Sequence, residues 1–303
     1  MRVLVSGSSG LIGTALRRSL EADGHDVTRL VRTEPGGPGE VRWDPGSGAV
    51  DAAALEGHDA AVHLAGVGIG DHRWTDDHKR AVLDSRVRGT TLLATTLGGL
   101  DRPPAVLASG SAIGYYGDRG DEVLTETSPP GTGFLADVVQ AWEEAAEPAA
   151  AAGIRVALLR TGVVQSPDGG ALRKQLTPFK AGLGGRLGSG RQWLSWISID
   201  DEVGAVRHVL EHPELSGPVN LTAPTPVTNA AFTAALGDAL HRPTPLPTPL
   251  LPLRLLFGRE MVAEMLVAGQ RVLPAALQAS GYRFCHPTLA GALSALLGTE
   301  PAG

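Results

Sequence analysis

Three glycines near the start of the chain have the spacing of a phosphate-binding turn. Gly7, Gly10 and Gly13 follow a short apolar run, Val3–Val5, and open a segment with leucines at helical spacing. Such a turn lets the backbone approach a pyrophosphate closely, and the amide N–H groups at the start of the helix attract negative charge. We interpret the turn as a dinucleotide site. The alternative is a tight strand-to-helix turn that binds no ligand.

The end of the next apolar run bears on which dinucleotide binds. The segment Asp26–Arg32 is expected to form the second strand, with Arg29 inside it and Arg32 at its end. At that point an acidic residue binds the ribose 2′-hydroxyl of NAD, whereas an arginine accommodates the 2′-phosphate of NADP. Glu34 is the nearby carboxylate and lies beyond the strand among prolines and glycines. We therefore expect NADP(H) to be favoured over NAD(H), with a solvated surface charge as the alternative role of Arg32.

Composition limits the partners that the chain can have. It has 303 residues, 43% of them hydrophobic, a net charge of −6 and one cysteine, Cys285. An acidic chain without a basic cluster is not expected to bind nucleic acid, and one cysteine suits a reducing compartment. No Cys/His set has zinc-ligand spacing, and no apolar run reaches the roughly 20 residues of a membrane span. We expect a soluble, cytoplasmic protein with a small-molecule substrate, no metal and no membrane partner.

Short apolar runs alternate with helical patterns through the first half of the chain. The candidate strands are Arg2–Ser6, Asp26–Arg32, Ala60–His63, Ala105–Ala108 and Arg155–Leu159, and the long candidate helices are Thr75–Leu97 and Leu135–Ala152. Such alternation predicts an α/β fold, with a Rossmann-type doubly wound parallel sheet and helices on both faces. Because ligands bind beyond the carboxyl ends of such strands, the loops that follow them are expected to line one crevice.

The pattern changes near Pro167. Glycines crowd the stretch from Gly182 to Gly190, which Arg186 interrupts and Arg191 follows. We interpret this stretch as a substrate-covering loop whose arginines can meet phosphate or carboxylate. A flexible surface loop is the alternative.

The last third of the chain has its own character. Five prolines from Pro243 to Pro252 predict a connecting segment, and a helical tail rich in leucine and alanine follows, over about Leu253–Leu297. We expect a nucleotide-binding domain over residues 1–165. A smaller C-terminal substrate-side region is expected over residues 166–303, with some segments that return to the sheet.

Four stretches together resemble a known family. They are the glycine turn, Asp59–Gly66, Ser109–Gly117 and Leu159–Val164. They are similar, in that order, to the phosphate turn of the extended short-chain dehydrogenases/reductases, their loop under adenine and ribose, their serine-containing strand end and their stretch near the nicotinamide. These are NAD(P)-dependent enzymes of the sugar epimerase and dehydratase type. The resemblance covers essentially the whole chain and implies a homodimer.

One atypical subgroup of that family, with a C-terminal helical extension, is the better match. Its shared motifs are Arg73-Trp74, Ser85-Arg86, Tyr115–Gly117, Gly169–Leu172, Gly182–Gly185, Gly188–Ile197, Gly269–Pro274 and Gly281–Phe284. The glycine turn and the resemblance together give the expected cofactor-binding residues. These are Gly7, Ser9, Gly10, Leu11, Ile12, Gly13, Arg32, Leu64, Ala65, Gly66, Arg86, Ser109 and Gly162.

The chain departs from the family at its catalytic pair. Typical members carry Tyr-x-x-x-Lys on the helix after the serine strand, and the lysine lowers the pKa of the tyrosine that moves the proton. If Glu143 stands at the glutamate that usually follows that motif, Leu135 falls on the tyrosine and Val139 on the lysine. Ser111 carries over by position, and Tyr115 is the nearby candidate acid.

Two functions follow from this departure. The first is an NADP(H)-dependent oxidoreductase or epimerase that acts on a small polar, sugar-like or phosphorylated substrate. The second is a sensor or scaffold that binds NADP(H) without catalysis, because the usual proton carriers are absent.

Overall fold

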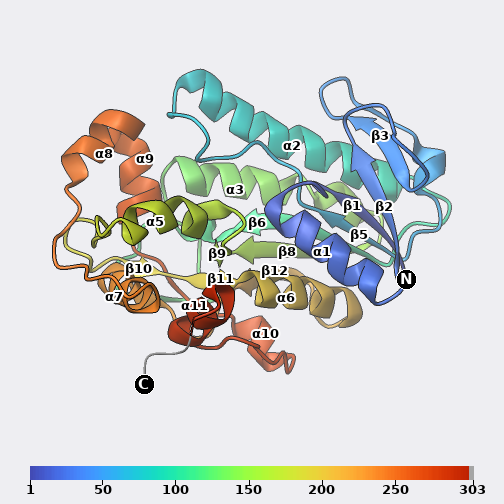
Figure 1. The fold of residues 1–303 in the computed structure, drawn as a ribbon. Helices are drawn as coiled ribbons and strands as arrows, with labels where there is room; N and C mark the ends of the chain where they lie inside the picture. Colours follow the sequence, from blue (N-terminus) through green and yellow to red (C-terminus); the bar gives the residue numbers. More distant parts are fainter. Residues whose placement is uncertain (300–303) are drawn as a thin grey trace.

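A computed structural model describes residues 1–299 and has an eight-stranded sheet at its centre (Figure 1). Its strands are β1 (Arg2–Ser6), β2 (Asp26–Val31), β3 (Glu40–Asp44), β4 (Ala49–Val50), β5 (Ala60–His63), β6 (Val106–Ala112), β8 (Arg155–Thr161) and β12 (Gly217–Leu221). They lie in the order β12-β8-β6-β5-β1-β2-β3-β4, and every neighbouring pair is parallel except β3 with β4. The predicted Rossmann-type sheet is confirmed.

Helices cover both faces of this sheet (Figure 1). On one face lie α1 (Leu11–Ala22) and α6 (Ile199–Glu211), and on the other lie α2 (Asp76–Gly98), α3 (Phe134–Glu144) and α4 (Glu147–Ala151). Side chains of a strand alternate between faces. Val3 and Val5 therefore pack in the core under α1, whereas Leu4 packs in the core under α2.

Most of the remaining elements gather at the carboxyl ends of the strands and beyond (Figure 1), whereas η1 comes directly before β5, near the start of β1. The short strands are β7 (Val123–Leu124), β9 (Val163–Gln165), β10 (Trp193–Leu194), β11 (Trp196–Ser198), β13 (Val227–Thr228) and β14 (Arg271–Val272). The helices are η1 (Ala52–Leu55), η2 (Ile113–Tyr116), α5 (Gly170–Lys180), α7 (Asn229–Ala239), α8 (Leu250–Phe257), α9 (Arg259–Met261), the π-helix η3 (Val262–Val267), α10 (Ala275–Ala279) and α11 (Leu289–Leu297). Within residues 1–299, no helix combines the length and apolarity needed to cross a bilayer.

Several element boundaries differ from the prediction. Strand β2 ends one residue early, at Val31, and β6 and β8 run on to Ala112 and Thr161. The single helix predicted over Leu135–Ala152 is two helices, α3 and α4. Pro148 explains the break, because its ring lacks an N–H and clashes with the carbonyl of the residue four places earlier.

The tail and the sheet edges also differ. The predicted helical tail is a series of short helices separated by β14 and by proline-containing turns. The prediction omitted β3, and it omitted β12, which returns from the substrate-side region to the sheet edge beside β8.

Candidate functional site

The turn between β1 and α1 has the geometry that close approach requires. Gly7 has φ +68°, and a Cβ added there would lie 2.6 Å from the carbonyl carbon of Leu64. A Cβ added at Gly13 would lie 2.2 Å from the carbonyl oxygen of Gly7. Helix α1 starts after Gly10 with no side-chain cap and no acidic residue in its first turn. Its first amide N–H groups are thus free of any competing side chain, which fits a phosphate ligand.

A cavity of about 800 Å³ opens over this turn. Its walls include the turn, the end of β2, the loop after β5 and one face of α2. Of the predicted cofactor residues, it is lined by Gly7, Ser9, Gly10, Arg32, Leu64, Ala65 and Gly66. The cavity thus brings together the glycine turn and the loop after β5, which the sequence predicts to bind the same dinucleotide.

The other predicted cofactor residues lie outside this lining. Leu11 packs against the loop at Gly169, and Gly13 lies directly against the backbone of Gly7 and Ser8. The Arg86 guanidinium donates to the carbonyl oxygens of Val67 at 3.0 Å and Val82 at 3.2 Å. Ile12, Ser109 and Gly162 likewise do not line the cavity.

The cations of the cavity differ in their partners. Arg29 is paired with Glu40, and Arg88 lies 3.3 Å from Asp84. Arg32 is exposed and pairs with no carboxylate among residues 1–299. It is therefore the cation at this end of the cavity that is available to an anionic ligand.

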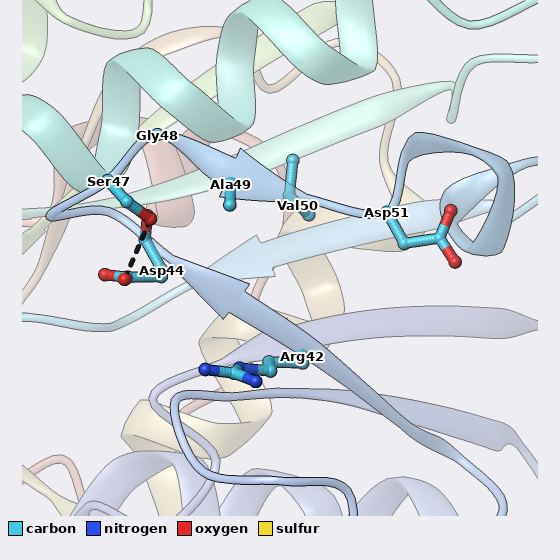
Figure 2. A pocket seen from close by; sticks show the side chains of 7 residues that line it. All are labelled: Arg42, Asp44, Ser47, Gly48, Ala49, Val50 and Asp51. Carbon is cyan, nitrogen blue, oxygen red and sulfur yellow. Dashed lines mark hydrogen bonds between the residues drawn. The ribbon is translucent and has the colours of Figure 1, made fainter.

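A smaller cavity of about 400 Å³ lies beside the hairpin of β3 and β4 (Figure 2). Asp44 lines both cavities, and Figure 2 shows its carboxylate bonded to the Ser47 hydroxyl, at 2.8 Å. Hydrogen bonds from Ser47 and from the Gly46 amide lower the pKa of Asp44. Its carboxylate is thus engaged in the turn, and its role there is to hold the hairpin.

Two buried polar groups lie side by side where β5 ends beside the middle of β6. His63 Nδ1 is 2.6 Å from the Ser6 hydroxyl, and its Nε2 has no partner among the described residues. The neighbouring Ser109 hydroxyl is also buried without a partner there. Burial lowers the pKa of His63 to about 4, so the ring is neutral near pH 7.

Ser111 is hydrogen-bonded to a buried ion pair. Its hydroxyl donates to Glu143 Oε1 at 2.5 Å, and Arg160 donates to both oxygens of the same carboxylate at 2.8 Å. The Arg160 side chain is 3% exposed, so this bidentate pair is nearly desolvated. Glu143 and Arg160 were not among the predicted site residues. In the sequence, Glu143 was used only as the reference position that aligns Leu135 and Val139 with the missing tyrosine and lysine.

The two adjacent tyrosines have different environments. Tyr116 is fully buried, donates to Asn220 Oδ1 at 2.7 Å and accepts from Arg160 at 3.1 Å. Burial raises its pKa. The Tyr115 ring is half-buried, with the Arg160 guanidinium 3.5 Å from its centroid. Tyr115 is therefore the more accessible phenol on η2.

Apolar side chains occupy the positions of the missing catalytic pair. Leu135 and Val139 both lie against Gly114 of η2, within 4 Å of a Cβ added there. One turn on, the Trp142 indole packs under Gly110 and donates to the Thr90 hydroxyl at 3.0 Å. Leu135, Val139 and Trp142 thus pack against the strand end, and none of these three side chains can exchange a proton with a substrate.

The start of α3 is capped from the far end of the sequence. Glu264 of η3 accepts from the amides of Phe134 at 3.1 Å and Leu135 at 2.9 Å. Lys79 of α2 pairs with Glu260 of the neighbouring α9. The C-terminal extension thus holds α2 and α3 together at the carboxyl edge of the sheet. Spacing alone gives no signal for a contact across about 130 residues.

The same extension supports the loop that follows Ser111. Gln270 donates from its amide to the carbonyl oxygens of Ile113 and Gly117, both at 3.0 Å. The Gly269 amide donates to Asp118 at 2.9 Å. The predicted Gly269–Pro274 motif is therefore a brace for η2.

The tryptophans and Asp201 have structural partners. Trp196 is fully buried, Trp74 donates to the Ile69 carbonyl, and Trp193 donates to Asp121. Ser198 caps α6, and Asp201 accepts from the amides of residues 285 and 286.

The glycine turn, the parallel sheet and the cavity define a Rossmann-type protein of the NAD(P)-binding class. A family model described as "NAD dependent epimerase/dehydratase family" matches residues 3–221, and one described as a domain of unknown function, DUF1731, matches residues 248–296. The chain belongs to the NAD dependent epimerase/dehydratase family, which confirms the resemblance read from the sequence.

Relatives match along nearly the full length. "Epimerase family protein Mb2239" of Mycobacterium bovis is 49% identical, over 96% of each chain. Human "Epimerase family protein SDR39U1" is 39% identical, over 98% of this chain and all of that one. The crystal structure of the human protein with NADPH superimposes with a TM-score of 0.89 at 37% identity, covering 98% of this chain and 99% of that one. The UDP-glucose 4-epimerase of Thermus thermophilus in complex with NAD, at 20% identity and a TM-score of 0.73, shares the fold.

Proposed function

We propose that the chain is an NADP(H)-dependent oxidoreductase or epimerase that acts on a small polar substrate. The observation that carries the proposal is the unpaired Arg32 at the end of β2, beside a glycine turn with free amides. A guanidinium at that point suits a 2′-phosphate, and the carboxylates nearby are already paired with Arg29 and Arg42. The NADPH in the human relative's structure supports the same preference.

The residues at the strand ends would position the substrate. A nicotinamide bound in the cavity supplies hydride transfer, and the chain supplies orientation and proton exchange. Ser111 would bind the substrate oxygen by turning its hydroxyl away from Glu143, which keeps its bidentate partner Arg160. Tyr115 is the proposed proton donor, and the Arg160 guanidinium that packs on its ring holds it in position.

Thermal unfolding with each of four nucleotides tests the cofactor assignment. A ligand that binds the native state raises the unfolding temperature, so NADPH and NADP⁺ should raise it more than NADH and NAD⁺. Arg32→Ala should abolish this difference by weakening the NADP(H) affinity about tenfold or more. Arg283→Ala, an exposed arginine elsewhere, should leave it unchanged. Equal shifts with all four nucleotides would remove the NADP(H) preference.

A non-catalytic NADP(H) sensor is the second candidate function. Leu135 and Val139, packed against Gly114, favour it, because neither side chain can move a proton. The two functions separate in a screen for NADPH oxidation with small carbonyl compounds. Turnover that Tyr115→Phe reduces supports the enzyme. An NADPH-dependent change in partner binding without turnover supports the sensor. Sedimentation of the apo and NADPH-bound chain would test the proposed homodimer.

A further inference from the structure

Two segments of the substrate-side region form one continuous surface, which we call the leucine–arginine surface. They are residues 170–191, with α5 and the glycine-rich loop, and residues 246–259, with α8. Leu187 and Thr248 pair as a parallel β-bridge, and the Thr248 amide donates to the Arg186 carbonyl oxygen at 2.8 Å. In Figure 1, α5 and α8 lie at the end of the molecule away from the N-terminus.

Exposed leucines concentrate on this surface. Within residues 1–299, the leucines with exposed side chains are Leu183, Leu246, Leu251, Leu255 and Leu256, between 65% and 77% exposed. All five belong to the two segments. Single exposed apolar side chains are ordinary, but a cluster of this kind marks a surface that contacts something other than water.

Helix α8 has two apolar sides, one that packs against the rest of the protein and one that is exposed to solvent. Leu250, Leu253 and Phe257 are half-buried at helical spacing, whereas Leu251 and Leu255, four residues apart, are exposed. No residue of the helix is fully buried. Leu251 and Leu255 thus form an apolar strip on the outer side of α8 that has no partner in the described part of the chain.

The charges on the surface all have one sign. Its exposed cations are Arg173, Lys174, Lys180, Arg186, Arg191, Arg254 and Arg259. Neither segment contains an aspartate or glutamate, although the chain as a whole has a net charge of −6. None of these cations forms an ion pair in the described part of the chain. The cations come from two segments far apart in the sequence, so the sequence alone shows no basic cluster. Brought together, they are complementary to a dense array of negative charge.

We propose that the leucine–arginine surface docks onto a bilayer that contains anionic lipid. Leucines on a surface helix insert at the boundary between headgroups and acyl chains, and surrounding arginines and lysines are drawn to anionic headgroups. Charge complementarity favours this occupant over a second copy that pairs through the same surface, because that pairing would bring like cations together. The expectation of no membrane partner rested on the lack of a spanning run, and a docked helix needs none.

Vesicle sedimentation with the full chain tests the proposal. The chain should sediment with vesicles that mix phosphatidylcholine and phosphatidylglycerol, and should stay in the supernatant with phosphatidylcholine alone. Added salt should weaken the binding, because it screens exposed charges. The double variant Leu251→Gln/Leu255→Gln should bind the mixed vesicles at least about tenfold more weakly, because two leucine side chains no longer insert among the acyl chains.

Matched variants separate docking from misfolding. Val123→Gln, at an apolar side chain 45% exposed elsewhere, and Arg283→Gln should bind as the wild type does. Both leucines are exposed, so circular dichroism of the double variant should be unchanged. Equal binding of the double variant and the wild type would overturn the proposal. So would a wild type that ignores the vesicles but forms a dimer that the double variant breaks, which would assign the surface to a second copy.

Discussion

Gly13 lies where the first turn of α1 passes over the phosphate turn, and no side chain fits between them. A methyl group there would lie 2.2 Å from the Gly7 carbonyl oxygen, which is backbone and cannot rotate away. Gly13→Ala should therefore displace the turn and weaken NADPH binding at least about tenfold. Titration of NADPH fluorescence measures this. Gly99→Ala, whose added methyl would make ordinary contacts at 3.6 Å, is the control. Unchanged affinity in Gly13→Ala would mean that the nucleotide does not use this turn.

At the scale of single residues, spacing along the chain predicted the turn but not the polar network. The glycines are three apart and lie between a strand and a helix, so local sequence carries the whole signal. The ion pair of Glu143 and Arg160 joins α3 to β8, and it becomes visible only when both elements lie on β6. Its arrangement depends on packing, which a single sequence does not encode locally.

At the scale of elements, the cap on α3 offers a direct comparison of two neighbouring glutamates. Glu264 accepts from two amides at the start of α3, whereas Glu260 makes an exposed ion pair with Lys79. Glu264→Ala should lower the free energy of unfolding by about 1–2 kcal/mol, because the amides lose their acceptor. Glu260→Ala should cost about 0–1 kcal/mol. Urea unfolding measures both, and equal losses would contradict the capping role.

The elements that the prediction omitted share a physical cause. Strand β12 begins with Gly217-Pro218, a pair that is typical of a turn, so the sequence did not indicate a strand there. Proline is nevertheless tolerated in β12 because it is an edge strand. Strand β3 is short and mixes charged with apolar residues, so its period is weak. In both, pairing with a neighbouring strand overrides local preference. The buried strands β1 and β5 carry uninterrupted apolar runs, and these were predicted with correct bounds.

At the scale of the whole molecule, two buried titratable groups set opposite limits on stability. Burial raises the pKa of Glu202 to about 8 from its usual 4.5, and lowers that of His63 to about 4 from its usual 6.5. Between about pH 4.5 and 8, Glu202 is ionised in the unfolded chain but protonated in the folded protein. Between about pH 4 and 6.5, His63 is protonated in the unfolded chain but neutral in the folded protein. Stability therefore falls with rising pH through the Glu202 range and with falling pH through the His63 range.

The two effects cancel between about pH 4.5 and 6.5, where their ranges overlap, and Glu202 acts alone from there to about pH 8. The free energy of unfolding should fall across this upper interval by at most about 1.4 kcal/mol per pH unit. Glu202→Gln should flatten it, whereas Glu211→Gln, at an exposed position, should not. Urea unfolding at several pH values measures the slope. A wild-type curve that is flat above pH 6.5 would show that Glu202 is ionised in the folded protein.

The parallel pair of β7 and β14 has a consequence for synthesis. It joins residues 123–124 to residues 271–272, and Gln270 beside it braces the loop after Ser111. A ribosome delivers the first partner long before the second, and pairs so distant in sequence close late. The nascent chain can assemble β1, α1 and the phosphate turn while it is still tethered. The candidate catalytic end, by contrast, acquires its brace only after residue 272 has been made.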